Sequence, residues 1–207
     1  MTPESEARRA FSLEVSSATL QALARRLTGD SSATNVLTRV QRSAQAPEEG
    51  QALYDALINT ARTSAGAFAI AAEEFCLGAK DLLSLAPHSR SKGYERFDLW
   101  ISADIRAGAL YRAVKNRASA VYDTLEKLIK AVRDIVAYAE EMDDTSAAQR
   151  ELALCALELK EVYDALEQIF FHESDNHVYS VRLNRAKGIL DEVLSLIHIS
   201  EPTRHLR

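Results

Sequence analysis

The stretch from Tyr54 to Leu82, YDALINTARTSAGAFAIAAEEFCLGAKDL, places apolar residues at alternating spacings of four and three. The repeated positions are Tyr54, Ile58, Ala61, Ala65, Phe68, Ala72, Phe75, Ala79 and Leu82. A mean spacing of about 3.5 residues keeps these positions on one stripe of a helix, which is typical of helices packed lengthwise in a bundle. Pro47 and Glu48 indicate where this helix begins, because proline fits a first turn and an acidic group there complements the helix dipole.

Two more long helices follow the same spacing. One is predicted from about Gly108 to Met142, with its apolar positions at Ala118, Val121, Leu125, Leu128, Val132, Ile135, Ala139 and Met142. The next opens at Ser146, which forms a capping-box pattern with Gln149, and its apolar positions are Leu152, Cys155, Leu159, Val162, Leu166 and Ile169. The sequence therefore predicts a mainly α fold, an antiparallel bundle of three long helices with short helices and short β segments at both ends.

Shorter elements flank these helices. Phe11–Val15 alternates apolar and polar residues and Val178–Leu183 is rich in β-favouring residues, so both are predicted to be strands. Tyr94–Ile101 is aromatic-rich and is predicted to be extended, and two short helices should end near Gly29 and Ala44. If the bundle is an insertion in a larger α/β domain, the strands at its two ends should lie side by side in the parent sheet.

Composition narrows the class of protein. The 207 residues carry a net charge of −5, include only 7 glycines and 4 prolines, and are typical of a helix-rich protein. The longest apolar stretches, such as residues 67–72, are too short to span a membrane, and the first ten residues lack the apolar core of a secretory signal. We expect a cytoplasmic protein in which Cys76 and Cys155 are small buried apolar residues and not a disulfide framework.

Motifs for catalysis or metal binding are missing from the sequence. It contains no glycine-rich phosphate loop, no H-E-x-x-H and no glutamate three positions before a histidine. The acidic pairs Glu73-Glu74, Glu140-Glu141 and Asp143-Asp144 are interpreted as solvated helix faces or helix ends, because adjacent carboxylates on a helix point in different directions. We therefore expect no catalytic, cofactor-binding or metal-ligating residue in this chain.

One basic segment suggests nucleic-acid binding. No acidic residue occurs between Asp104 and Asp123. The candidate contacts in this segment are Arg106, Tyr111, Arg112, Lys115 and Arg117. Basic and aromatic side chains together can follow a single strand through phosphate contacts and base stacking. The alternative is an ordinary basic helix face that is balanced by acidic residues on the neighbouring helix.

The end of the chain has an unusual origin under our interpretation. Leu194–Arg204, LSLIHISEPTR, resembles the in-frame translation of a transposase adapter used to make sequencing libraries, so native sequence is predicted to stop near Val193. The other interpretation is a genuine apolar C-terminal strand. The predicted organisation is a strand with short helices at 1–46, a helical bundle at 47–172, a return strand at 173–193 and adapter read-through at 194–207.

Three stretches, in order, resemble the arch region of DinG/XPD-like DNA helicases. Glu6–Gln41, EARRAFSLEVSSATLQALARRLTGDSSATNVLTRVQ, resembles the segment that follows the DEAH box in that family. GYERFDLWISADIR, which opens Gly93–Met142, is similar to the strand that leads into the arch helices. DNHVYSVRL, at Asp175–Leu183, is similar to the strand with which the chain returns to the motor, although Ser180 stands where the family usually has tryptophan.

The resemblance implies a fragment of an ATP-dependent 5′→3′ DNA helicase, namely the helical insertion between the DEAH box and the following motor motifs. Its partners would be single-stranded DNA and the motor domain of the same chain, with no membrane. ATP and Mg²⁺ would bind the motor, and the cysteines of the iron–sulfur cluster found in many relatives would precede the DEAH box. The alternative is a stand-alone cytoplasmic helical-bundle regulator or adaptor, similar to PhoU, that binds partner helices.

Overall fold

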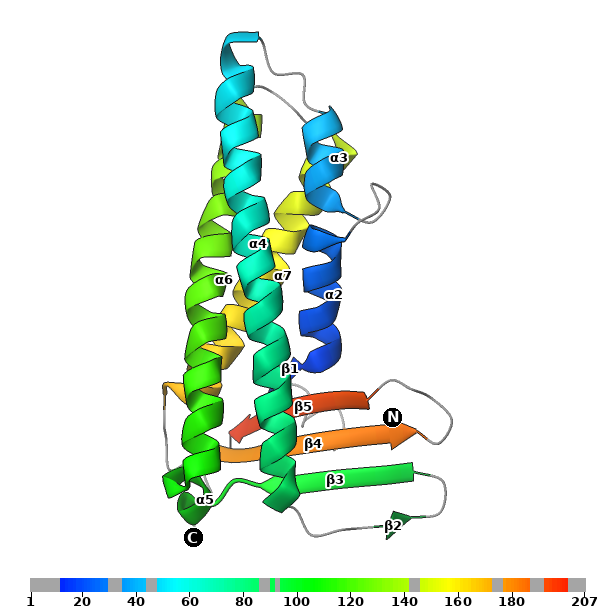
Figure 1. Ribbon diagram of the computed structural model, residues 1–207, viewed down its shortest axis with the longest axis vertical. Coiled ribbons are helices and arrows are strands. Elements are labelled where there is room, and N and C mark those ends of the chain that lie inside the picture. The colour runs from blue at the N-terminus through cyan, green and yellow to red at the C-terminus, as the bar shows by residue number, and fades with distance from the viewer. Residues whose placement is uncertain are drawn as a thin grey trace, which may run out of the picture. The chain divides into compact units, whose positions relative to one another are not determined.

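A computed structural model describes residues 12–29, 35–43, 48–85, 90–91, 94–141, 146–172, 177–186 and 192–200 (Figure 1). The helices are α2 (Ser17–Thr28), α3 (Val36–Ser43), α4 (Glu48–Leu82), α5 (Ala103–Ala107), α6 (Ala109–Glu141) and α7 (Ala147–Phe170), with a 3-10 turn η1 (Leu83–Leu85) after α4. The strands are β1 (Ser12–Ser16), β2 (Arg90–Ser91), β3 (Tyr94–Trp100), β4 (His177–Ala186) and β5 (Glu192–Ser200). The fold is mainly α, and α4, α6 and α7 are the three long helices of an antiparallel bundle, as the sequence predicts.

These elements belong to two compact units. The first unit contains the described residues of Met1–Thr19, Glu74–Ser119 and Asp164–Arg207, which include all the strands named above. The second unit contains the described residues of Leu20–Glu73 and Ala120–Tyr163. The division falls within α4, α6 and α7, so each unit has its own segment of the three long helices and its own core.

The core consists of the positions that the apolar spacing selects. All nine positions of Tyr54–Leu82 are buried, and none is more than 4% exposed. The predicted positions of α6 from Ala118 to Ala139 and those of α7 are buried as well. The last predicted position of α6, Met142, lies outside the described residues. Burial of these side chains removes apolar surface from water, which is the main favourable term in helix packing.

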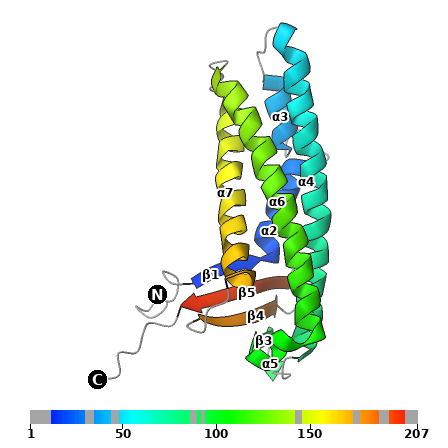
Figure 2. The ribbon, with the colours of Figure 1, turned by 90° about the vertical axis from the view of Figure 1, so that its left-hand side faces the viewer.

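Ion pairs join the short helices to α7 in the second unit, where Figures 1 and 2 show α2 and α3 alongside it. The Arg26 guanidinium on α2 donates to the Glu158 carboxylate at 2.5 Å, and Arg39 on α3 donates to Glu151 at 2.7 Å. Because all four side chains are partly exposed, each pair stabilises the fold by at most about 1 kcal/mol. The buried leucines of α2 and α3 contribute more, since each removes a large apolar side chain from water.

The start of α7 only partly follows the capping-box prediction. The Ser146 hydroxyl accepts a hydrogen bond from the Gln149 backbone N–H at 3.2 Å, as expected for a cap. The Gln149 side chain, however, donates to the Tyr54 hydroxyl at 2.7 Å. Gln149 is 5% exposed, so its amide satisfies a buried hydroxyl of α4, which a capping-box pattern in one helix cannot reveal.

The first unit contains one five-stranded sheet in the order β1-β5-β4-β3-β2 (Figure 1), and every neighbouring pair is antiparallel. The strands β1, β3 and β4 confirm the three extended segments predicted from the sequence. β1 and β4 share this sheet but do not pair with each other, because β5 lies between them and pairs with both. The prediction that the two end segments lie side by side is therefore wrong in detail.

β5 includes most of the segment that resembles an adapter translation. Ser195–Ile199 pair with β1, and Glu192–Ser200 pair with β4. Strand pairing uses backbone groups and requires only an extended segment with suitable alternation. The pairing of β5 is therefore independent of where its codons come from, and the adapter origin stays a prediction.

The core assignment predicts a contrast between two residues on α4 in the second unit. Replacing Phe68, which is fully buried, by alanine should lower the free energy of unfolding by about 3–5 kcal/mol, because it deletes a buried ring and leaves a cavity. Replacing Ile70, which is 63% exposed, should change it by less than about 0.5 kcal/mol. Urea unfolding followed by circular dichroism measures both, and equal losses would contradict the assigned helix face.

The sheet predicts what happens when β5 is removed. A chain that ends at Val193 should lose backbone hydrogen-exchange protection in β1 and β4, because β5 supplies the ladder partners of both strands. A chain that ends at Ser200 retains β5 and is the matched control. Amides of α3 should keep their protection in both chains. Full protection of β1 in the shorter chain would show that β5 is not its partner.

Candidate functional site

The predicted nucleic-acid contacts lie in the first unit, on α5 and the first turns of α6. Ser102 caps α5, because its hydroxyl accepts a hydrogen bond from the Ile105 N–H at 3.4 Å. The Arg106 guanidinium lies over the ring of Tyr179 on β4, with 4.9 Å between its central carbon and the ring centroid. The Arg106 Nε is buried and has no hydrogen-bond partner among the described residues. The Arg106 guanidinium therefore already makes a cation–π contact with the Tyr179 ring.

Tyr111 is part of the core and does not offer its ring to a nucleic-acid base. The residue is 4% exposed, and its ring stacks on Phe170 of α7 with 6.3 Å between the centroids. Phe170 in turn makes an edge-on contact with Phe75 of α4 at 5.8 Å. The prediction that Tyr111 stacks on a base is therefore corrected, since burial between helices leaves no open ring face.

The remaining basic residues of α6 divide between two sides of the helix. The Arg117 guanidinium lies 3.8 Å from the Asp81 carboxylate on α4. It also packs so closely over Gly78 that a Cβ at this glycine would meet the guanidinium. For Arg117, the alternative interpretation therefore holds: an acidic residue of the neighbouring helix balances the charge.

Arg112 and Lys115 occupy a different face of α6 from Arg117. They are three residues apart, so they share one face of α6. Arg112 is exposed and Lys115 is half-buried. Among the described residues, the Arg112 guanidinium has no hydrogen-bond or ion-pair partner. Of the five predicted contacts, Arg112 is the residue best placed to meet a ligand from solvent, and Lys115 lies beside it on the same helix face.

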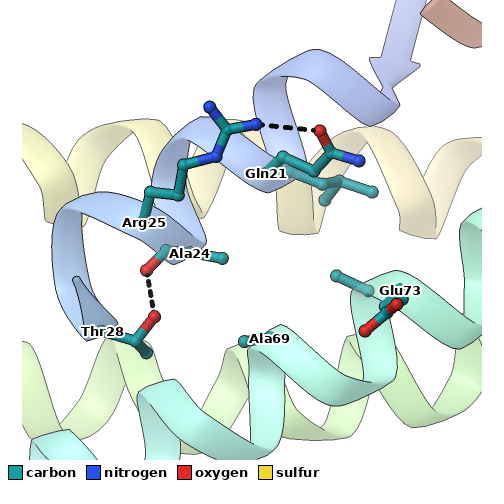
Figure 3. Close-up of a pocket in the computed structure, with 8 residues that line it drawn as sticks. Gln21, Ala24, Arg25, Thr28, Ala69 and Glu73 are labelled. Carbon is teal, nitrogen blue, oxygen red and sulfur yellow. Dashed lines mark hydrogen bonds between the residues drawn. The ribbon is translucent and has the colours of Figure 1, made fainter. Parts of the chain in front are cut away.

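A groove of about 420 Å³ lies between α2 and α4 in the second unit (Figure 3). Its walls are mainly apolar and small, and include Ala24, Ala69 and Ala72. Two of its polar side chains bond locally, as Figure 3 shows: Arg25 donates to Gln21 at 3.2 Å, and the Thr28 hydroxyl donates to the Ala24 carbonyl at 2.8 Å. The groove therefore offers mainly apolar surface, with the Glu73 carboxylate at one side.

A second groove in the same unit lies between α6 and α7 and has a volume of about 330 Å³. Lys130, Arg133 and Lys160 line it together with Tyr163. These cations do not stand out in the sequence, because Glu126 and Asp134 interrupt the basic run. The signal that could have found them is the three-residue spacing of Lys130 and Arg133, which puts both on one helix face.

Cys155 is buried between the two ion pairs that join α2 and α3 to α7. Burial raises the pKa of its thiol to about 11, because the low-dielectric surroundings disfavour a thiolate, although Arg26 partly offsets this effect. A thiol that stays protonated is a poor nucleophile. Cys155 therefore has a structural role, as the sequence predicts for a small buried residue.

Two further classes of site have no support within the part of the chain that the structure describes. No group of three histidine, cysteine, aspartate or glutamate side chains there is placed to hold a metal ion. No helix among the described residues is both long enough and apolar enough to cross a membrane.

The environment of the cysteines predicts their reactivity. At about pH 8, the folded chain should react with a thiol reagent only at Cys76, which is half-buried, because the raised pKa and burial of Cys155 protect it. In denaturant both thiols should react. Peptide mapping after labelling identifies the modified residue, and rapid labelling of Cys155 in the folded chain would contradict its placement.

Comparison with known proteins identifies no relative: no protein-family model, curated protein or solved structure matches the chain. Function must therefore be inferred from the placement of the side chains and from the resemblance of the sequence to one family.

Proposed function

We propose that the chain is the helical arch of a DinG-type, ATP-dependent 5′→3′ DNA helicase of the cytoplasm, and that this arch helps to hold single-stranded DNA beside the motor. The observation behind the proposal is the ordered resemblance of three stretches that lie between Glu6 and Leu183. It agrees with a second fact: β1 and β4, which precede and follow the long helices, belong to one sheet. An insertion whose two ends return to one sheet has this topology.

In this proposal the motor hydrolyses ATP with Mg²⁺, and the arch supplies binding surface. A passive guide for a moving strand needs contacts with the sugar–phosphate backbone, which is the same for every base. Arg112 and Lys115 suit this role. Arg112 has a planar guanidinium without a partner among the described residues, and a guanidinium can bind two phosphate oxygens at once.

Arg106 and Arg117 are less suited to contact the strand. Moving Arg117 toward a phosphate would leave the Asp81 carboxylate without its ion pair. Moving Arg106 would break its contact with the Tyr179 ring. Each of these losses would offset part of the gain from a phosphate contact, so we assign the strand contact to Arg112, with Lys115 beside it on the same face of α6.

One observation favours the alternative, a stand-alone regulator or adaptor that binds partner helices. Leu154 and Leu157 on α7 are 57% and 63% exposed. They are three residues apart and so share a helix face, where a partner helix could cover them. The two functions predict different genomic sequences on either side of the codons for this chain.

The gene itself provides the most direct test. Under the helicase proposal, genomic sequence upstream of the codon for Glu4 should encode Asp-Glu-Ala-His in the same reading frame within a few codons. Downstream of the codon for Val193, it should encode the remaining motor motifs in place of the adapter-like segment. An in-frame stop codon just upstream of Met1 would contradict the proposal and favour the adaptor.

The strand contact predicts a specific loss of binding. Arg112→Ala/Lys115→Ala should weaken the affinity of the chain for oligothymidine about 5- to 10-fold and reduce the slope of log affinity against log salt by about 1.4, or about 0.7 for each lost phosphate contact. Fluorescence anisotropy of a labelled oligonucleotide measures both quantities.

The matched control removes the same charge from the same unit. Lys80→Ala/Arg117→Ala also deletes two cations, of which Arg117 is paired with Asp81, and should change the affinity less than 2-fold. Equal losses in the two double variants would indicate a general charge effect and remove Arg112 and Lys115 from the proposed site.

A further inference from the structure

The groove between α6 and α7 in the second unit has cations on both of its helices. Lys130 and Arg133 belong to α6, and Lys160 belongs to α7. Its volume of about 330 Å³ lies at the lower end of the range for small-ligand sites. This is enough space for one phosphate and the sugar attached to it, but not for a large folded ligand.

Two of these cations have no protein partner where one would be expected. Lys130 is four residues from both Glu126 and Asp134, the spacing at which ion pairs form along a helix. Nevertheless, neither Lys130 nor Arg133 forms a hydrogen bond or an ion pair with any described residue. Both are exposed, so their charges remain free to meet an anion.

The third cation is held by an aromatic pair. The Lys160 ammonium lies 5.1 Å from the centroid of the Tyr163 ring. That ring stacks on Tyr122 of α6 with 4.0 Å between the centroids and 20° between the planes. An aromatic face attracts a cation without neutralising it. The contact with the ring therefore limits the motion of the Lys160 ammonium at the groove.

The charge of the groove is positive despite two carboxylates. Glu126 and Asp134 also line it, so three cations face two anions. At physiological ionic strength, charges more than about 8 Å apart are largely screened. A ligand in the groove therefore responds to these side chains far more than to the net charge of −5 of the whole chain.

We infer that this groove binds a phosphodiester group of single-stranded nucleic acid, with Lys130 and Arg133 on the phosphate oxygens and Lys160 at the other wall. The ligand class rests on the proposed function, whereas the location rests on the groove itself. Arg133 can donate two parallel hydrogen bonds to one phosphate, and the lysines add point charges. This site is separate in sequence from Arg112 and Lys115, and it adds a phosphate contact in the second unit.

Two measurements on the 207-residue chain test this site. In the first, Lys130→Ala/Arg133→Ala should weaken binding of labelled oligothymidine of roughly 20 nucleotides about 5- to 10-fold and lower the salt slope by about 1.4. The matched control, Lys127→Ala/Arg150→Ala, removes two exposed cations of the same unit that do not line the groove. It should change the affinity less than 2-fold.

The second measurement uses inorganic phosphate and nuclear magnetic resonance. At constant ionic strength, replacing chloride by phosphate should shift the backbone amide signals of residues that line the groove, and these shifts should vanish in Lys130→Ala/Arg133→Ala. Because both side chains are exposed, the variant should keep the helical circular dichroism and melting temperature of the parent chain, which separates lost binding from lost folding.

The outcomes separate the site from the proposed function. If oligothymidine binds equally to the parent chain and to Lys130→Ala/Arg133→Ala, the groove is not the site, while the helicase proposal stands. If phosphate shifts the groove signals but oligothymidine does not bind, the groove is a site for free phosphate and the strand-holding function fails. If neither probe affects the groove, the inference is overturned.

Discussion

The lengthwise packing of three helices along their apolar stripes determines the positions of the other parts of each unit. On α4 this stripe alternates alanines with large residues, for example Ala65 with Phe68 and Ala72 with Phe75. A small residue lets a neighbouring helix approach, and the next large residue fills the space beside it. Burying one large apolar side chain contributes about 1.5–3 kcal/mol, more than the partly exposed ion pairs of α2 and α3 with α7.

Polar contacts have a different role in this packing. The hydrogen bond from Gln149 to Tyr54 joins α7 to α4 in the buried part of the second unit. It fixes which turn of one helix faces which turn of the other, because a slip would leave the buried Gln149 amide without this partner, whereas the Tyr54 hydroxyl also donates to the Val40 carbonyl at 3.4 Å. The Gln149 Oε1 atom has no partner among the described residues, so this contact orients the helices more than it stabilises them.

Apolar spacing was sufficient to predict the bundle and the faces of its helices, since the apolar face of each helix can be read from its own sequence. The same rule could have placed Tyr111 correctly. Extending the α6 stripe backwards from Ala118 at spacings of four and three reaches Val114 and then Tyr111, both of which are buried. The aromatic ring was assigned to a ligand because it stood beside arginines, and periodicity was the better guide.

The remaining differences arise from contacts between elements that are far apart in sequence. The pairing of Arg117 with Asp81 depends on which face of α6 meets α4. β5 lies between β1 and β4 in the sheet. Backbone hydrogen bonding alone allows several strand orders, so the sequence of the strands does not predict this one. The α6–α7 groove also depends on contacts between distant segments. A search for segments without acidic residues does not find Lys130, because Glu126 and Asp134 each lie four residues from it.

The cations of this chain differ in how much free energy they can still gain from a ligand. Arg26, Arg39 and Arg117 lie beside carboxylates, so binding a phosphate would require each to give up an existing partner. Arg112 and Arg133 have no such partner among the described residues and lose only their hydration. Because an exposed ion pair contributes little net free energy, the difference at each site is modest, about 1 kcal/mol or less. Under the proposed function these differences would add for a nucleic-acid strand that contacts several cations, so the unpaired cations should determine its path more than the density of basic residues in the sequence does.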